Sequence, residues 1–260
     1  MRSEKEQLII RAISYMKEHL DEELTSEELA SHIGYSPYHF SRVFKEITGV
    51  SPRHYLSALR IEAGKELLVD PSNSILKTLL NVGFRSIGTF SSKFKQFVGL
   101  SPKQFQKSMK PLHQFINEYD FSKELQPLNL LTPSVTCRVV TPTSFKGIVF
   151  IGLFPRPIPD QEPIVGTVLN HQKASCTFSN VPIGTYYILA TTLPKSLNPK
   201  SYFVLTNTYR GKGDSPVVIE QHTSLYTEIV LREPLPFDPP ILINLPKLLL
   251  STEKRKQEEK

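Results

Sequence analysis

One pattern of aromatic residues, a glycine and a Ser-Pro pair occurs twice in the first 110 residues of this 260-residue chain, fifty positions apart. The first copy is SPYHFSRVFKEITGVSPRHYL, residues 36–56, and the second is SIGTFSSKFKQFVGLSPKQFQ, residues 86–106. The matched positions are Phe40 and Phe90, Phe44 and Phe94, Gly49 and Gly99, Ser51 and Ser101, Pro52 and Pro102, and Tyr55 and Phe105. A chain with this duplication must fold one local unit twice.

Each copy carries the start and stop signals of short helices. The Ser-Pro pairs predict helix starts, because Pro is favoured at the first helical position. Glycines that follow the apolar runs predict helix ends. Apolar residues at helical spacing complete the pattern. We therefore expect seven helices, at about 4–20, 26–33, 36–48, 51–69, 75–82 and 86–98, with the last one starting at Ser101.

The composition changes after about residue 140. Pro becomes frequent, and Val, Ile, Thr, Tyr and Phe form short runs such as TYYILATTL, residues 185–193. Several short apolar runs separated by turn residues are typical of a β-sandwich or barrel. The sequence thus predicts a multidomain chain, all-α and then all-β: a double helix-turn-helix domain at 1–110, a partly helical connector at 111–140, a β-sandwich at 141–250 and a disordered tail at 251–260.

Positive charge is concentrated on the duplicated part. The chain has a formal net charge of +6, and residues 71–110 contain seven basic residues and no acidic one. Residues 31–60 contain four basic residues and one acid, Glu46. A basic field of this kind suits a polyanionic partner. A solvated basic surface would explain the charge alone equally well.

Several functional classes lack support in the sequence. No apolar run reaches the roughly 18 residues of a membrane span, and the first ten residues are too charged for a secretory signal, so we expect a cytoplasmic protein without a membrane partner. Cys137 and Cys176 lack metal-ligand spacing and are expected to be reduced structural thiols. The sequence suggests no cofactor, no metal site and no catalytic residues.

A short helix, a glycine turn and a longer helix form the plan of a helix-turn-helix unit. In that plan the second helix enters the DNA major groove. Arg42 is the best candidate for base readout, because a guanidinium can pair bidentately with guanine. The candidate DNA-binding residues of the first unit are Ser36, Tyr38, His39, Ser41, Arg42 and Lys45.

The second unit has a different polar face. Its candidates are Arg85, Ser86, Thr89, Ser91, Ser92, Lys93 and Lys95, and Ser92 stands where the first unit has Arg42. We therefore expect the second unit to supply phosphate anchoring more than base readout. The helix predicted at 51–69 would be about 27 Å long at ~1.5 Å per residue, and successive major-groove faces lie roughly 34 Å apart. One chain could thus place two recognition helices, at about 36–48 and 86–98, in consecutive grooves.

The residues GYSPYHFSRVFKEITGVSPRHYL and GFRSIGTFSSKFKQFVGLSPKQF resemble the AraC/XylS class of bacterial transcription regulators. The resemblance covers about residues 4–108. It implies a seven-helix domain that binds double-stranded DNA at an asymmetric promoter or operator site, usually as an activator, and it leaves open RNA polymerase and a small-molecule effector as further partners. Leu79 departs from the small alanine usual in the class, and Ser92 from a common arginine. The DNA-binding part also comes first here, whereas it is more often last.

The β part offers a shorter resemblance. CTFSNVPIGTYYILATTL, residues 176–193, resembles β-sandwiches of the prealbumin-like or carboxypeptidase-regulatory type. Pro182 and Gly184 are expected to form a turn, with Tyr187 and Leu189 entering the core. Such a companion domain would sense a ligand or mediate association. The alternative functional class is a sensory module whose main role is small-molecule capture, and the oligomeric state stays open.

An enzyme is the third reading. Tyr209, Arg210 and Gly211 resemble the closing motif of transthyretin-like hydroxyisourate hydrolases, although here about fifty residues follow them. The two histidines of this half, His171 and His222, lack a partner motif. A hairpin turn at 210–214 explains the same residues, so the sequence favours a regulator that is not an enzyme.

Overall fold

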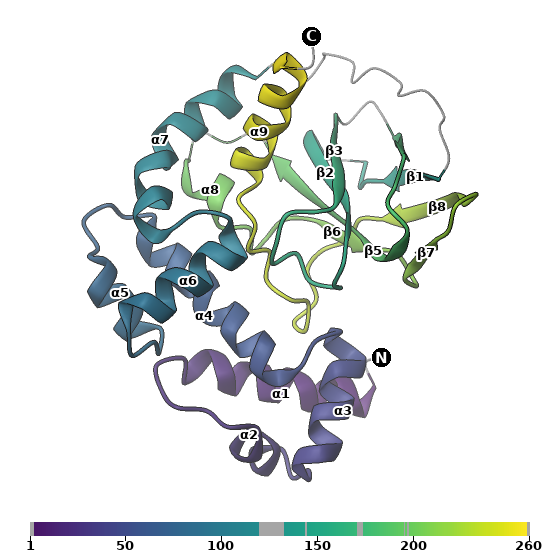
Figure 1. The fold of residues 1–260 in the computed structure, drawn as a ribbon. Coiled ribbons are helices and arrows are strands. Elements are labelled where there is room, and N and C mark those ends of the chain that lie inside the picture. Colours follow the sequence, from purple (N-terminus) through teal and green to yellow (C-terminus); the bar gives the residue numbers. More distant parts are fainter. Residues whose placement is uncertain are drawn as a thin grey trace. The chain divides into compact units, whose positions relative to one another are not determined.

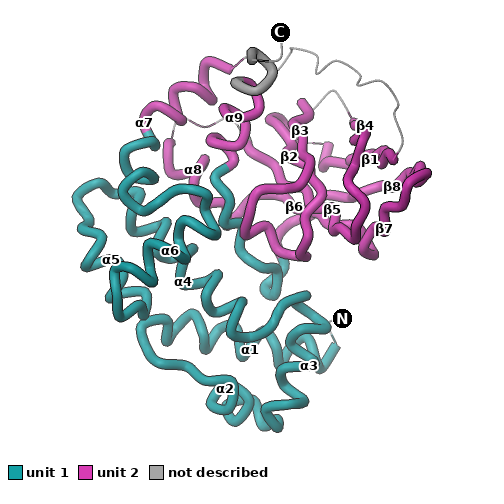
Figure 2. The backbone as a smooth tube through the Cα atoms, viewed as in Figure 1, with its two compact units in different colours: residues 1–109, 235–244 teal, residues 110–234, 245–260 magenta. Residues whose placement is uncertain are grey.

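The structure is a computed structural model in which residues 3–119, 133–143, 145–170, 174–194, 196 and 198–258 are described. Seven helices precede the described strands along the chain, a short helix lies between β5 and β6, and one more helix follows β8 (Figure 1). The chain divides into two compact units, coloured in Figure 2. Unit 1 comprises residues 1–109 and 235–244, and unit 2 comprises residues 110–234 and 245–260.

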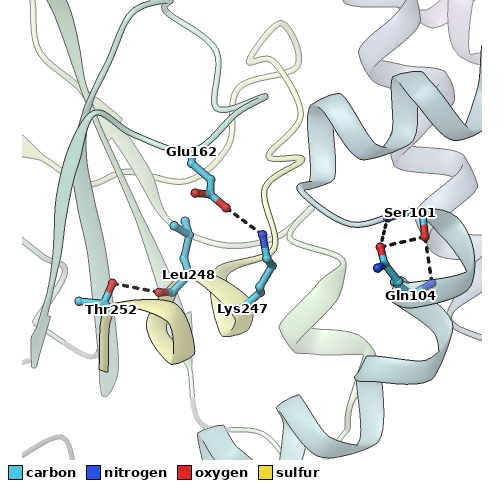
Figure 3. Close-up of polar contacts among 6 residues, drawn as sticks. All are labelled: Ser101, Gln104, Glu162, Lys247, Leu248 and Thr252. Atoms are coloured by element: carbon cyan, nitrogen blue, oxygen red, sulfur yellow. Dashed lines mark hydrogen bonds and ion pairs between the residues drawn. The ribbon is translucent and has the colours of Figure 1, made fainter. Parts of the chain in front are cut away.

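The helices of the first part of the chain have the predicted order. They are α1 (Glu4–Glu18), α2 (Ser26–His32), α3 (Pro37–Thr48), α4 (Pro52–Leu68), α5 (Ile75–Asn81), α6 (Ile87–Val98) and α7 (Pro102–Glu118). Side-chain caps explain where they begin. At α2, the Thr25 hydroxyl accepts a hydrogen bond from the Glu28 amide while the Glu28 carboxylate accepts one from the Thr25 amide. At α7, Ser101 and Gln104 form the corresponding pair of contacts (Figure 3).

The core of unit 1 repeats one aromatic arrangement. In the first copy, the ring centroids of Phe40 and Phe44 are 5.4 Å apart, and those of Phe44 and Tyr55 are 5.3 Å apart. In the second copy, the corresponding pairs Phe90–Phe94 and Phe94–Phe105 are each 5.5 Å apart. Edge-on and tilted packing at these separations is favourable for aromatic rings. The prediction of a duplicated helical scaffold is confirmed.

Helix α4 joins the two copies. Its Tyr55 ring packs edge-on against Phe44 beneath α3. Near its other end, Gly64 lets the Phe90 ring of α6 approach so closely that a Cβ atom on residue 64 would lie 3.2 Å from that ring. A helix of 17 residues is about 25 Å long. Helix α4 is therefore the spacer between the two helix-turn-helix copies.

Unit 2 contains two β-sheets. One has the strand order β4-β1-β8, and the other β3-β2-β5-β6, with β7 also paired to β5. The strands are β1 (Ser134–Val140), β2 (Gly147–Phe154), β3 (Val165–Asn170), β4 (Ser175–Ser179), β5 (Gly184–Pro194), β6 (Arg210–Lys212), β7 (Val217–Ile219) and β8 (Ser224–Val230). Residues from both sheets share one core that includes Val135, Ile151 and Ile229. The β-rich second half is as predicted.

Two further helices belong to unit 2. They are α8 (Lys200–Phe203) and α9 (Leu245–Glu258). The Tyr202 hydroxyl of α8 donates a hydrogen bond to the Asn117 side chain, at 2.9 Å. In α9, Lys247 pairs with Glu162 at 2.9 Å, and the Thr252 hydroxyl donates to the Leu248 carbonyl (Figure 3).

Some predicted boundaries differ from the structure. The connector predicted at 111–140 contains the end of α7 and the whole of β1. The tail predicted as disordered at 251–260 continues α9 as far as Glu258. A single short strand and a charged helix end both carry weak periodic signals, so the sequence did not define either boundary.

Two details of the β part were also wrong. On strand β5, Tyr186 and Ile188 face the core between the two sheets, whereas Tyr187 and Leu189 lie on the other, half-buried face of the strand. Both faces of this strand are apolar, so alternation could not fix which one turns inward, and a one-residue error in register inverts every side chain. The predicted hairpin turn at 210–214 is in part the strand β6, which pairs with β5.

Candidate nucleic-acid interface

The two candidate recognition helices have the same construction. Helices α3 and α6 are each 12 residues long. Each begins at a serine whose hydroxyl accepts an amide hydrogen bond, Ser36 or Ser86. Each ends at a left-handed glycine, Gly49 at φ 83° or Gly99 at φ 82°. The phenylalanines of both helices are buried, whereas Ile87 at the start of α6 is 53% exposed and lies among the predicted polar residues.

The outer face of α3 carries long polar side chains. Tyr38 is 82% exposed, and Arg42 and Lys45 are also exposed. His39 and Ser41 are half-buried, and the His39 ring packs edge-on against Tyr35 with centroids 4.6 Å apart. Tyr38, Arg42 and Lys45 can therefore reach a groove, while His39 contributes to the packing of the turn.

The outer face of α6 is made mainly of small hydroxyl residues. Ser86, Thr89, Ser92 and Lys95 are exposed, whereas Ser91 is half-buried. The Ser86 hydroxyl accepts the Thr89 amide at 3.1 Å and donates to the Thr89 hydroxyl at 2.9 Å. Because the two hydroxyls are engaged with each other, this end of the helix offers backbone amides and short side chains to a partner.

Lys93 is held along its own helix. Its ammonium group donates to the Gln96 side chain at 3.2 Å and lies 5.6 Å from the centroid of the Phe97 ring. Its side chain is half-buried. Lys95 is exposed and is thus the better placed of the two α6 lysines for a phosphate contact.

The turn of the second unit is one residue longer than that of the first, a feature that the constant offset of fifty conceals. In the first unit the Tyr35 amide donates to the Ala30 carbonyl, and in the second the Phe84 amide donates to the Leu79 carbonyl, both at 2.9 Å. These pairs are 49 positions apart, whereas the recognition helices are 50 apart. The additional residue is Arg85, which is exposed directly before the cap of α6. Aligning the first helices of the two units separately would have found it.

Arg60 of α4 connects this helix to the loop between α1 and α2. Its guanidinium donates to the backbone carbonyls of Leu20, at 2.9 Å, and Glu22. Burial lowers the pKa of Arg60, and the nearby positive charge of Arg85 lowers it further. Arg60 therefore holds the loop between α1 and α2, while the charge at Arg85 is directed to the surface.

Other kinds of site find little support. Among the described residues, no group of three or more His, Cys, Asp or Glu side chains could hold a metal ion. No helix within the described ranges is long and apolar enough to cross a membrane. Of the two histidines weighed for catalysis, His222 is exposed and His171 lies outside the described residues.

Comparison with known proteins indicates the same kind of domain. Residues 29–108 match a family described as a helix-turn-helix domain. This part of the chain is a helix-turn-helix domain. The Melibiose operon regulatory protein of Escherichia coli (strain K12) is 31% identical over 99 residues, which are 38% of this chain and 33% of that protein. The resemblance of the helix-turn-helix domain to the AraC/XylS class is confirmed.

Solved structures similar to this chain include two DNA-binding proteins. One is a transcriptional regulator from Chromobacterium violaceum, of the AraC-type DNA-binding domain-containing proteins, with 28% identity, coverage of 40% of this chain and 92% of that one, and a TM-score of 0.38. The other is the DNA-binding domain of AdpA, a global transcriptional factor, in complex with a target DNA, with 26% identity, coverage of 40% and 93%, and a TM-score of 0.38. The helix-turn-helix domain spans about a third of the length of the curated regulator named above.

Proposed function

We propose that the protein is a sequence-specific DNA-binding transcription regulator whose helices α3 and α6 enter consecutive major grooves. The observation that carries the proposal is the repeated presentation of a capped, 12-residue helix by one connecting helix. Two such helices on one chain suit a long, asymmetric site, because each reads its own groove. Access to a promoter would require the protein to be in the bacterial cytoplasm.

Separate roles follow for the two polar faces. Arg42 is proposed to read a base, with Tyr38 against a thymine methyl group or the backbone and Lys45 on a phosphate. Ser36, His39 and Ser41 support the same helix end. On α6 the proposed phosphate contacts are Arg85 and Lys95, together with Ser86 and the first amides of the helix. Thr89, Ser91, Ser92 and Lys93 would add shorter-range contacts and little base discrimination.

The proposed role of the β-rich unit is sensing or association. The second candidate is that the main role of the β-rich unit is to capture a small molecule, whose chemical class no described residue identifies. A hydrolase is less well supported. Tyr209 packs edge-on against Phe145, and the Arg210 guanidinium donates to the Leu205 carbonyl at 2.8 Å, so both side chains have structural contacts. We propose no catalytic role. An effector and RNA polymerase are further proposed partners, with activation as the expected direction.

A mobility-shift assay tests the regulator proposal. The full chain is titrated onto DNA from upstream of its own gene and onto random DNA of equal length, at several salt concentrations. The proposal expects a preferred complex whose affinity falls steeply with salt. Equal affinity for both DNAs at every salt concentration would contradict sequence-specific binding.

A further inference from the structure

A segment from beyond the last strand belongs to the helical unit. Residues 235–244, LPFDPPILIN, follow β8 in the sequence and precede α9, yet they form part of unit 1 (Figure 2). We call this segment the strap. Its Ile241, Leu242 and Ile243 are buried, with Leu242 fully inaccessible. The strap thus contributes core residues to a unit otherwise made from the first 109 residues.

Helix α4 holds the strap through two side chains. The Tyr55 hydroxyl donates a hydrogen bond to the Asp238 carbonyl at 2.9 Å. The Lys65 ammonium group donates to the Ile241 carbonyl at 3.0 Å and to the Leu242 carbonyl at 3.1 Å. These contacts join residues more than 170 positions apart in the sequence. They run along the spacer helix from its first turns to its last.

Lys65 shows how far the spacer helix depends on the strap. Its side chain is only 1% exposed. A lysine buried to this extent must find hydrogen-bond acceptors within the protein. Both acceptors given by the structure are strap carbonyls. Burial lowers the pKa of Lys65 to about 8, while the carboxylates of Glu62 and Glu66 partly counter that change. A lysine placed here is tolerated because the strap receives its hydrogen bonds.

Tyr55 connects the strap to the base-reading helix. The same ring whose hydroxyl reaches Asp238 packs against Phe44, a core residue of α3. Both ends of the strap continue directly into unit 2, through β8 on one side and α9 on the other. A movement of the chain at either end of the strap would therefore displace the strap residues that contact α4.

We infer that the strap completes the DNA-binding unit, and that it is the element through which the β-rich unit acts on the spacing of α3 and α6. The first part rests on contacts alone. The second part rests on the proposed function, because spacing matters only if both helices read DNA. In this arrangement the buried side of α4 is the docking surface and donates the hydrogen bonds, and its partner is a segment of the same chain.

Hydrogen exchange on the full chain tests the first part. Leu242→Asp places a charge at the fully buried strap position, and Val230→Asp places the same group at a residue that is 59% exposed. The inference expects Leu242→Asp to speed amide exchange in α4 at least tenfold, with β2 and β5 unchanged, and Val230→Asp to leave α4 unchanged. Unchanged exchange of α4 in Leu242→Asp, or equal acceleration in β2 and β5, would overturn it.

DNA binding distinguishes the two parts. In the full chain, Tyr55→Phe removes one strap contact and is expected to weaken specific binding relative to wild type, while the affinity for random DNA stays the same. Unchanged specific binding would overturn the transmission role. If wild type itself shows no sequence preference, the proposed function fails, and the exchange result alone decides whether the strap completes the unit.

Discussion

Gly83 lies directly against the backbone carbonyl of Leu20, so that a Cβ atom on residue 83 would overlap that oxygen. The Arg60 guanidinium donates to the same carbonyl and would lie 3.0 Å from the added carbon. The turn of the second helix-turn-helix unit, the loop after α1 and the spacer helix α4 therefore meet at one point. This contact fixes how the two helix-turn-helix copies are placed relative to each other within unit 1.

Gly83→Ala tests that contact. The φ of Gly83 is 78°, so alanine would be strained there in addition to the backbone clash. We expect a loss of about 3 kcal/mol or more in the free energy of unfolding, as for severe core substitutions. The measurement is urea denaturation followed by helical circular dichroism.

Two other glycines are matched controls for this prediction. Gly34 has a φ of 75° but nothing within 4 Å of an added Cβ, so Gly34→Ala should cost about 1 kcal/mol from strain alone. Gly88 has neither feature and lies in α6, so Gly88→Ala should be neutral or slightly stabilising. Equal losses at Gly34 and Gly83 would show that the contact with Leu20 contributes nothing.

Arg85 and Lys95 should anchor phosphates. Each is exposed beside or on α6, where no base-reading arginine is present. Arg85→Ala or Lys95→Ala should weaken binding to specific and random DNA by the same factor, and should reduce the salt slope by about 1. Fluorescence anisotropy over a salt series measures both quantities. Lys17→Ala, an exposed lysine in the last turn of α1, is the control. A change in sequence preference with no change in salt slope would assign these residues to base readout instead.

Lys65 should make the stability depend on pH. Burial lowers its pKa from 10.5 to about 8 in the folded protein, so between these values the unfolded chain binds a proton that the folded protein has released. The free energy of unfolding should therefore rise from pH 8 toward pH 10.5, by up to about 3 kcal/mol for this group. Below pH 8 the contribution should be constant. Urea denaturation at pH 7 to 10 should show this rise in wild type and not in Lys65→Met; the same rise in both proteins would rule out Lys65 as its source.

The two thiols should differ in reactivity. Cys137 and Cys176 are register partners on β1 and β4. A hydrogen bond with Cys176, and then burial, raises the pKa of the Cys137 thiol. Because the thiolate is the reactive form, a disulfide reagent at pH 8 should modify Cys176 first and Cys137 only after unfolding. Cys176→Ser should remove the fast phase and Cys137→Ser should keep it. Two equally fast thiols in folded wild type would contradict this assignment.

The helical unit was largely predictable because its signals are local. Gly49 and Gly99 were expected to end helices, and both adopt the left-handed conformation that glycine favours. Ser-Pro pairs marked helix starts for the same reason, since capping involves residues within one turn. The extra residue at Arg85 was missed because the offset of fifty was measured only from the second helix of each unit onward.

The strap could not be predicted from its sequence. LPFDPPILIN contains three prolines and no periodic pattern, and its partners Tyr55 and Lys65 are more than 170 residues away. Local propensity carries no information on such pairs. The inverted face of β5 has a related cause, because Tyr186 and Tyr187 are equally suited to a core, and tertiary packing selects between them.

Selection of bound sites from a random DNA pool tests the central claim most directly. Wild type, Arg42→Ala and Ser92→Ala are compared in parallel, because these positions correspond in the two recognition helices. If α3 and α6 enter consecutive major grooves, wild type should enrich a site with two half-sites about 10 base pairs apart. Arg42→Ala should lose preference at one half-site, and Ser92→Ala should change little. A wild-type pool without enrichment, or a larger loss of preference from Ser92→Ala than from Arg42→Ala, would contradict the account.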